Sequence, residues 1–395
     1  MPRPRVLLAW ESGDGRGHLS KLKAMAVLLG QDFVYDAALC RMQNAGELTP
    51  LCDLVFPCAY LPYSRERRRA AGSPPTATWG EFLGDLGFTD TGFLIRQIDW
   101  WVRTIRARAS SMVVGDFSPC AILAARALGV PSVTLGTGYT VPPASMAEFP
   151  VLLPEFARRI YDEGQMVEAL NGALRHFGLP CVDHLPQLYE ATQCLPRTLA
   201  LLDPYAAQRN HRTWPPLDAP PPLAGAGDEV FAYFSTSEAT EQALIAALCQ
   251  LGLPVRLFMP GLEAELAGRL AASGVHIEHA PLAPAEIARR ARIMVHAGQH
   301  GSLCMALGMG LPQIALPQQL EQQFHAWRAE MSGTVHVLSR AMRAPDAIVS
   351  AIRAAYDDVV LAARACDLAR TLRPLLASNE VGALRDAVLS HLSAA

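Results

Sequence analysis

The sequence predicts an α/β protein of two domains, each a doubly wound parallel sheet covered by helices. Three observations support this expectation. Both halves alternate short apolar runs with helical stretches, a proline-rich segment separates the halves, and a length of 395 residues suits two domains. Hydrophobic residues make up 51% of the chain and charged residues 18%, so each domain can bury a sizeable core.

Short apolar runs in the first half are typical of buried strands. The expected strands are Arg5–Trp10, Phe33–Leu39, Met112–Val114 and Ser132–Leu135. Helical patterns at Leu19–Leu29 and Cys120–Leu128 fall between strands, which favours parallel pairing with helices on both faces. Residues 140–195 break this alternation and are expected to be mostly helical and irregular.

A proline-rich stretch, Thr213–Asp228, ends this first series. It has five prolines and no apolar period, as expected of a stiff linker. The alternation then restarts. The expected strands of the second half are Val230–Phe234, Val255–Phe258, Val275–Glu278, Ile293–Val295, Gln313–Ala315 and Val335–Leu338. Pro345 suits the first position of a late helix.

These patterns predict an N-terminal domain over residues 1–214, a linker over 215–228 and a C-terminal domain over 229–375. A final helix over 376–395 follows, and we expect it to pack back on the first domain. Two doubly wound halves joined by a linker leave a cleft between them, and ligands of such sheets bind at the carboxyl ends of the strands.

Composition narrows the class of protein. The net charge of −3 gives no indication of a nucleic-acid partner. The nine cysteines form no Cys-x-x-Cys pair, so we expect buried thiols in a reducing compartment, with neither a zinc site nor a disulfide framework. No apolar run approaches the roughly 18 residues of a transmembrane segment. Arginines far outnumber lysines, which hints at a GC-rich bacterial gene. The expectation is a cytoplasmic bacterial protein, with a homodimer left open.

The most informative segment runs from Ile293 to Gly333. A strand is expected to end at His296, glycines follow at Gly298 and Gly301, and a helix opens near Ser302. Glycines allow a ligand to approach the backbone closely, and a helix N-terminus offers free N–H groups that suit a diphosphate. The imidazole of His296 and the hydroxyl of Ser302 can add hydrogen bonds to phosphate oxygens.

This segment resembles the nucleotide-sugar signature of family 1 GT-B glycosyltransferases, which have two Rossmann-like domains facing across a cleft. The matching positions are His296, Gly298, Gly301–Ser302, Ala306–Leu307, Gly310, Pro312, Pro317, Glu321–Gln322 and Ala326. The resemblance implies that His296, Gly301 and Ser302 contact the donor diphosphate and that Glu321 and Gln322 bind hydroxyls of the donor sugar. The alternative is that these are ordinary strand–turn–helix residues of any Rossmann-like half.

One position departs from the family pattern. The family usually has a glutamate eight residues after the histidine, where it holds the ribose hydroxyls. This register carries Cys304, or Met305 if one inserted residue is allowed, and neither side chain accepts a strong hydrogen bond. A dTDP-sugar donor, which lacks the 2′-hydroxyl, is favoured over a UDP-sugar. The alternatives are that Gln299 or His300 reaches the ribose instead, or that the affinity for the donor is simply low.

Hydroxyl residues follow the first strand of the second half. The resemblance places a phosphate-facing loop there, at Ser235 and Thr236. The alternative is a plain N-cap, with Ser237, for a helix that starts near Glu238.

A glycine-rich turn, Gly13–His18, follows the first strand. Its glycine spacing does not fit a dinucleotide fingerprint, and Asp36 lies inside the second strand instead of closing it. His18 and Asp116 both lie just past strand ends. If Met112–Val114 is the fourth strand, it neighbours the first strand across the switch point, and the two side chains can meet. A carboxylate-held imidazole is a general base suited to neutral pH. The family resemblance likewise implies that His18 is the catalytic base and that Asp116 orients it, the alternative being a capping or packing histidine.

Together these features predict an inverting glycosyltransferase that moves a sugar from a nucleoside-diphosphate sugar to a hydroxyl of an acceptor that the sequence does not identify. No Asp-x-Asp motif is present, so we expect neither a metal nor another cofactor besides the sugar nucleotide, a dTDP- or UDP-sugar. The alternatives are a catalytically silent GT-B homologue that activates a partner protein, and a sugar-nucleotide epimerase.

Two weaker features lie in the first half. The basic run Arg65–Arg69 is expected to be solvated surface, with contact to an anionic acceptor or a membrane as the alternative. Aromatic residues concentrate at Trp79, Phe82, Phe88, Phe93, Trp100 and Trp101. Core packing accounts for most of them, and one or two are candidates for an acceptor pocket.

Overall fold

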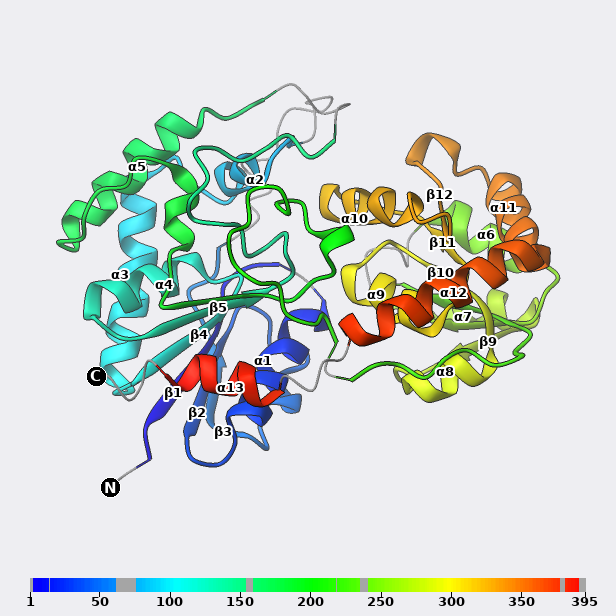
Figure 1. Cartoon of the computed structure of the whole chain (residues 1–395), viewed down its shortest axis with the longest axis horizontal. Coiled ribbons are helices and arrows are strands. Elements are labelled where there is room, and N and C mark those ends of the chain that lie inside the picture. Colours follow the sequence, from blue (N-terminus) through cyan, green and yellow to red (C-terminus); the bar gives the residue numbers. More distant parts are fainter. Residues whose placement is uncertain are drawn as a thin grey trace. The chain divides into compact units, whose positions relative to one another are not determined.

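The structure is a computed structural model that describes residues 3–13, 15–61, 76–153, 159–217, 219–234, 241–376 and 381–390. The chain divides into two compact units. The first comprises Met1–Thr198, Asp203–Trp214 and Asn379–Ala395, and the second comprises Leu199–Leu202 and Pro215–Ser378. In its described part, each unit contains a six-stranded parallel sheet flanked by helices (Figure 1).

The first unit opens with β1, the strand that leads to the first candidate site. Its elements are β1 (Arg5–Trp10), α1 (Arg16–Leu29), β2 (Val34–Leu39), η1 (Ala45–Glu47), β3 (Cys52–Pro57), α2 (Trp79–Asp85), α3 (Thr91–Ala107), β4 (Met112–Asp116), α4 (Pro119–Leu128), β5 (Ser132–Gly136), α5 (Glu163–His176), η3 (Leu185–Tyr189), β6 (Gln193–Pro196) and α13 (Val381–Leu389).

The strand order of this sheet is β3-β2-β1-β4-β5-β6, so the chain winds outward from β1 in both directions. The predicted adjacency of the first strand and the strand at Met112 is confirmed, with Val6 opposite Met112 in a parallel register. Since parallel strands end at the same edge, the loops after β1 and β4 lie together at the switch point.

Alternating side chains of β1 form the core beneath α1. Val6 and Leu8 pack with Leu19 and Leu22 of the helix, and all four are essentially inaccessible to solvent. Burial of such side chains contributes about 1.5–3 kcal/mol each, which fixes the start of α1 against the sheet. Val388 of α13 joins the same cluster.

The second unit repeats the plan, with the strand order β12-β11-β10-β7-β8-β9. Its elements are η4 (Ala200–Leu202), β7 (Glu229–Tyr233), α6 (Gln242–Gln250), β8 (Val255–Phe258), α7 (Ala264–Ala272), β9 (Val275–Glu278), α8 (Pro284–Arg290), β10 (Ala291–His296), α9 (His300–Met309), β11 (Gln313–Ala315), α10 (Leu320–Glu330), β12 (Val335–Val337), η6 (Arg340–Met342), α11 (Pro345–Asp357) and α12 (Val359–Leu376). Among the described helices, none is long and apolar enough to cross a bilayer.

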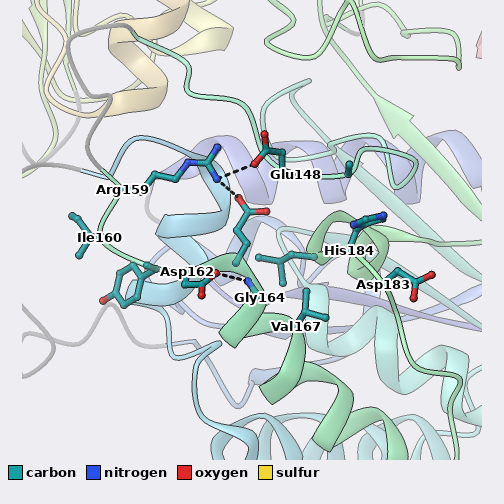
Figure 2. A pocket seen from close by; sticks show the side chains of 12 residues that line it. Glu148, Arg159, Ile160, Asp162, Gly164, Val167, Asp183 and His184 are labelled. Atoms are coloured by element: carbon teal, nitrogen blue, oxygen red, sulfur yellow. Dashed lines mark hydrogen bonds and ion pairs between the residues drawn. The ribbon is translucent and has the colours of Figure 1, made fainter.

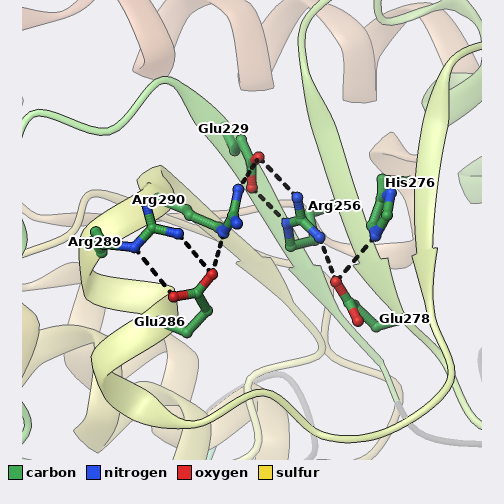
Figure 3. A network of polar contacts seen from close by, with 7 residues as sticks. All are labelled: Glu229, Arg256, His276, Glu278, Glu286, Arg289 and Arg290. Atoms are coloured by element: carbon green, nitrogen blue, oxygen red, sulfur yellow. Dashed lines mark hydrogen bonds and ion pairs between the residues drawn. The ribbon is translucent and has the colours of Figure 1, made fainter.

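Ion pairs join one side of this sheet to α8 (Figure 3). Arg256 of β8 pairs with Glu229 of β7, with its Nε 2.6 Å from Oε2, and also with Glu278 of β9. Arg290 of α8 reaches Glu229 at 3.4 Å. The Arg256, Glu229 and Glu278 side chains are only 12–19% exposed, so these pairs are screened less than surface pairs and help to fix α8 against the strands.

Candidate active site

His18 and Asp116 meet at the switch point of the first sheet. His18 is the third residue of α1 and Asp116 is the last residue of β4. Their Nδ1 and Oδ2 atoms lie 3.2 Å apart, with the His18 side chain 15% exposed and the carboxylate fully buried. The contact expected from strand adjacency is therefore present. A carboxylate at Nδ1 favours the tautomer that leaves a lone pair on Nε2.

The loops that carry this pair are tied together by Glu11, which sequence reasoning did not single out. Its buried carboxylate accepts hydrogen bonds from the backbone N–H groups of Cys120 at 3.1 Å and Ala121 at 2.5 Å. Burial raises the pKa of Glu11 to about 8, while these amides at the start of α4 favour the ionised form. The Ser118 hydroxyl donates to the Ala9 carbonyl at 2.6 Å, a second tie between β1 and α4.

The His18 ring stacks on Trp10, with ring centroids 5.1 Å apart and planes 22° apart. Its Nε2 edge faces Gly13, which has a φ of 97°, and a Cβ at Gly13 would lie 2.6 Å from His18 Nε2. Glycine is thus required on two counts, the left-handed backbone and the close approach. Any side chain at position 13 would block Nε2.

A lysine completes this group, and the sequence analysis did not predict it. Lys21 Nζ lies 2.5 Å from Asp116 Oδ2, the oxygen that also faces His18. Burial would raise the pKa of Asp116, but the Lys21 ammonium on its Oδ2, with the His18 ring beside the same oxygen, holds this pKa below its usual range. The available signal was helical spacing, because residues three apart share one face of a helix.

The second unit places His296 at the end of β10, but its ring is engaged within the fold. The Gly298 N–H donates to Nδ1 at 2.9 Å, and Nε2 lies 2.9 Å from Gln313 Oε1. Nδ1 is therefore the acceptor, and Nε2 carries the proton that it donates to Gln313. Burial lowers the pKa of His296 to about 4, so the ring is neutral near pH 7. Both ring nitrogens of His296 are thus bound within the protein, where they stabilise the turn.

The turn after His296 packs against α10. A Cβ on Gly298, whose φ is 79°, would lie 2.9 Å from the Gln322 carbonyl oxygen and 3.2 Å from the Ala326 Cβ. The small residues at 298 and 326 thus allow turn and helix to touch. Gly301 is different. It is helical and exposed, and a Cβ there would meet nothing within 4 Å. The backbone at the start of α9 is therefore open, next to a buried Ser302.

Gln299, the N-cap residue of α9, carries a buried polar group near this opening. Neither its Nε2 nor its Oε1 has a hydrogen-bond partner among the described residues. A buried amide without partners costs about 1–3 kcal/mol, which a bound polar ligand can offset. His300 is occupied in packing, because its ring lies 5.0 Å from that of His325 and near the Cys304 sulfur.

The two residues expected to bind the donor sugar lie at the start of α10. Gln322 is buried and its Oε1 accepts the Gln318 N–H at 2.8 Å, so it also shapes the preceding loop. Glu321, in the first turn, is partly exposed. In the register expected for a ribose-binding glutamate, Cys304 is fully buried against Leu307 and Leu376.

No protein-family model matches the chain, and no curated protein matches it in sequence. Solved structures do match. The calicheamicin glycosyltransferase CalG4 has a TM-score of 0.70 at 16% identity, covering 99% of this chain and 99% of its own. The spinosyn rhamnosyltransferase SpnG complexed with thymidine diphosphate scores 0.65 at 17% identity, covering 96% and 99%. The glycosyltransferase VinC in complex with DTDP scores 0.65 at 15% identity, covering 98% and 100%.

The chain has the GT-B fold. The fold class predicted from the sequence is thereby confirmed, because both units are parallel α/β sheets and the match covers nearly the whole chain. At these identities the likeness establishes the fold alone, and the activity has to follow from the residues of the site.

The remaining residues considered in the sequence analysis either lie outside the described part of the chain or have a structural role. Ser235, Thr236 and Arg65–Arg69 lie outside the described residues. Asp36 is buried in β2 and bound by Arg5 at 2.9 Å and Arg108 at 2.8 Å, so it is engaged structurally.

The aromatic residues of the first unit are mostly core, as expected. Phe88 and Trp101 are fully buried. Trp79 packs between Phe117 and Tyr139, with ring centroids 4.9 Å away in both cases. Phe117 follows Asp116 and lies 6.3 Å from the His18 ring, so this cluster adjoins the pair of titratable residues.

A cavity of about 620 Å³ opens elsewhere on the first unit, lined by neither His18 nor Asp116 (Figure 2). Its lining is rich in acidic side chains, and Arg159 lies between two of them, 3.1 Å from Glu148 and 3.9 Å from Glu163. Burial raises the pKa of Glu163 to about 7. The backbone N–H of Phe149 lies 3.3 Å from both of its oxygens.

We expect Glu163→Gln to stabilise the protein above pH 7. A carboxyl whose pKa rises on folding binds its proton more tightly in the folded state, so wild-type stability falls as pH rises from about 4.5 through about 7. The amide of glutamine is neutral at every pH, so Glu163→Gln avoids this loss of unfolding free energy, which is on the order of 1–3 kcal/mol. Near pH 4.5 the two proteins should have the same free energy of unfolding. Urea unfolding across this range measures it. Glu148→Gln, at a side chain 66% exposed, should change little, and equal pH profiles for Glu163→Gln and wild type would contradict the expectation.

Proposed function

We propose that this GT-B protein is an inverting glycosyltransferase that moves a sugar from a nucleoside-diphosphate sugar to an acceptor hydroxyl without a metal ion. The observation that carries the proposal is the His18–Asp116 pair at the switch point of the first unit, with Nε2 facing Gly13, where any side chain would block it. In the second unit, the open backbone at Gly301 supplies a site suited to a diphosphate.

On the acceptor side, His18 Nε2 takes the proton of the attacking hydroxyl while the oxygen attacks the anomeric carbon. The oxygen attacks the face opposite the leaving group while the nucleoside diphosphate leaves with the bonding electrons, so this single displacement inverts the configuration at that carbon. Asp116 keeps the proton on Nδ1 and stabilises the imidazolium that forms. Such a positioned base contributes roughly 10²–10⁴-fold to the rate. The aromatic cluster that includes Phe117 adjoins this base.

On the donor side, backbone N–H groups at the start of α9 and the helix dipole balance the charge of the leaving diphosphate. Gly301 allows the phosphates to approach, and the Ser302 hydroxyl adds a donor. The neutral His296 ring stabilises the conformation of this turn through its hydrogen bonds to Gly298 and Gln313. Gly298 allows the turn to pack closely against α10. Glu321 and Gln322 at the start of α10 are assigned to the sugar hydroxyls.

A thymidine diphosphate sugar fits this site better than a uridine one. Cys304 is buried where a ribose-binding carboxylate is expected. A nucleotide without the 2′-hydroxyl has one group fewer that needs a hydrogen-bond partner there. SpnG complexed with thymidine diphosphate and VinC in complex with DTDP share the fold, which agrees with this choice.

The direct test is titration calorimetry with dTDP, UDP and thymidine monophosphate in the presence of EDTA. We expect dTDP to bind at least as tightly as UDP, and the monophosphate to bind at least tenfold more weakly because it lacks the second phosphate. Chelation should leave affinity unchanged. Loss of binding on adding EDTA would contradict metal independence, and failure of every nucleotide to bind would overturn the donor site.

A further inference from the structure

We propose that Lys21 is a positioning residue of the acceptor-side site, holding Asp116 and setting the pH range in which His18 is free to accept a proton. The inference rests on the proposed function, since it assigns Lys21 a part in the work of the same base. Nothing in the family resemblance pointed to this lysine.

The first support is geometric. Asp116 Oδ2 faces two nitrogen groups at once, the Lys21 ammonium with Nζ at 2.5 Å and the His18 imidazole with Nδ1 at 3.2 Å. The lysine side chain is only 21% exposed and the carboxylate is fully buried, so water screens these contacts weakly. Asp116 Oδ1 has no hydrogen-bond partner among the described residues, which concentrates both interactions on one oxygen.

The second support is the placement of the other charges around α1. Arg16 and Lys23 of α1 both pair with Glu47 of η1, at 2.5 Å and 4.0 Å. Glu11, after β1, is bound to the start of α4.

At the other end of α1, Arg385 of α13 pairs with Asp32 at 3.0 Å. Asp14 lies outside the described residues. Within the described chain, the ion pairs of the Asp116 carboxylate are therefore those with Lys21 and His18.

The Asp116 carboxylate is shared by the Lys21 ammonium and the His18 imidazole, and this sharing affects the protonation of His18. An ammonium group on Oδ2 neutralises much of the negative charge that would stabilise protonated His18, and it repels the imidazolium directly. Both effects favour neutral His18, the form that can act as a base. A carboxylate without Lys21 would hold the imidazolium more strongly and keep the base protonated to higher pH.

The test separates charge from packing with two substitutions at one site. Lys21→Gln keeps a hydrogen-bond donor and removes the charge, whereas Lys21→Arg keeps the charge. Lys23→Gln, on the same helix and paired with Glu47, is the matched control. The readout is the NMR titration of the His18 ring, assigned by the signal that disappears in His18→Gln.

We expect the midpoint of the His18 titration to rise by about 0.5–1.5 pH units in Lys21→Gln. It should stay near wild type in Lys21→Arg and Lys23→Gln. The acidic limb of the pH profile of kcat/KM for sugar transfer should move in the same direction. Unchanged midpoints in Lys21→Gln, or equal shifts in Lys21→Gln and Lys23→Gln, would overturn the inference.

The outcome is distinguishable from failure of the proposed function. If wild type transfers sugar and the titration of Lys21→Gln does not move, the assignment of Lys21 fails alone. If the titration moves as expected but wild type transfers no sugar to any acceptor tested, the proposed function fails and the charge coupling stands. If Lys21→Gln does not fold, Lys21→Arg still tests the claim, because a large shift there would contradict a role set by charge.

Discussion

Replacing His18 with alanine is expected to lower kcat by roughly 10²–10⁴-fold while leaving nucleotide affinity nearly unchanged. The ring combines a carboxylate partner at Nδ1 with an Nε2 atom that faces Gly13, which is the geometry proposed for the base. The turn proposed to hold the donor belongs to the other unit, at the end of β10, so we expect removal of the His18 ring to leave the proposed donor contacts intact. Transfer kinetics and calorimetry on the same protein measure the two quantities.

Two further variants sharpen this result. Asp116→Asn should also reduce kcat, because an amide no longer fixes the Nδ1–H tautomer or stabilises the imidazolium. His336→Ala, at an exposed position on β12, is a matched histidine control and should retain full activity. A fully active His18→Ala protein would remove the assignment of the base. Wild type that binds nucleotide yet transfers nothing would favour a silent homologue.

The buried strands were predictable because their residues face core on both sides. Arg5–Trp10 and Gln313–Ala315 were predicted with the bounds that the structure shows, and apart from Arg5 every residue of both strands is buried. β3 and β6 were missed. Both are edge strands, and β3 is partly exposed along its length.

The meeting of His18 and Asp116 could be predicted because strand order alone brings the ends of β1 and β4 together. Lys21 and Glu11 could not be found this way. Their contacts depend on the phase of α1 and on side chains that reach a neighbouring element. The motif located His296 correctly at a strand end, but spacing cannot show that both ring nitrogens bind within the fold.

The second large effect is expected at Gly301, where stability and binding should change in opposite directions. The position is helical, exposed and open, so Gly301→Ala should fold normally and gain up to about 1 kcal/mol in the free energy of unfolding. The added methyl group would occupy the space proposed for the diphosphate. Nucleotide affinity should therefore fall at least tenfold, or about 1.4 kcal/mol.

Gly268 of α7 provides the matched control, because it too is helical and exposed, and a Cβ there would meet nothing within 4 Å. Gly268→Ala should show a similar gain in stability and no change in nucleotide affinity. Denaturant unfolding and calorimetry on both variants decide the matter. If Gly301→Ala binds dTDP as tightly as Gly268→Ala does, the start of α9 does not hold the diphosphate. A coupled loss of stability and affinity would instead mean that the alanine disturbs the turn, since only a gain in stability with a loss of binding isolates contact with the ligand.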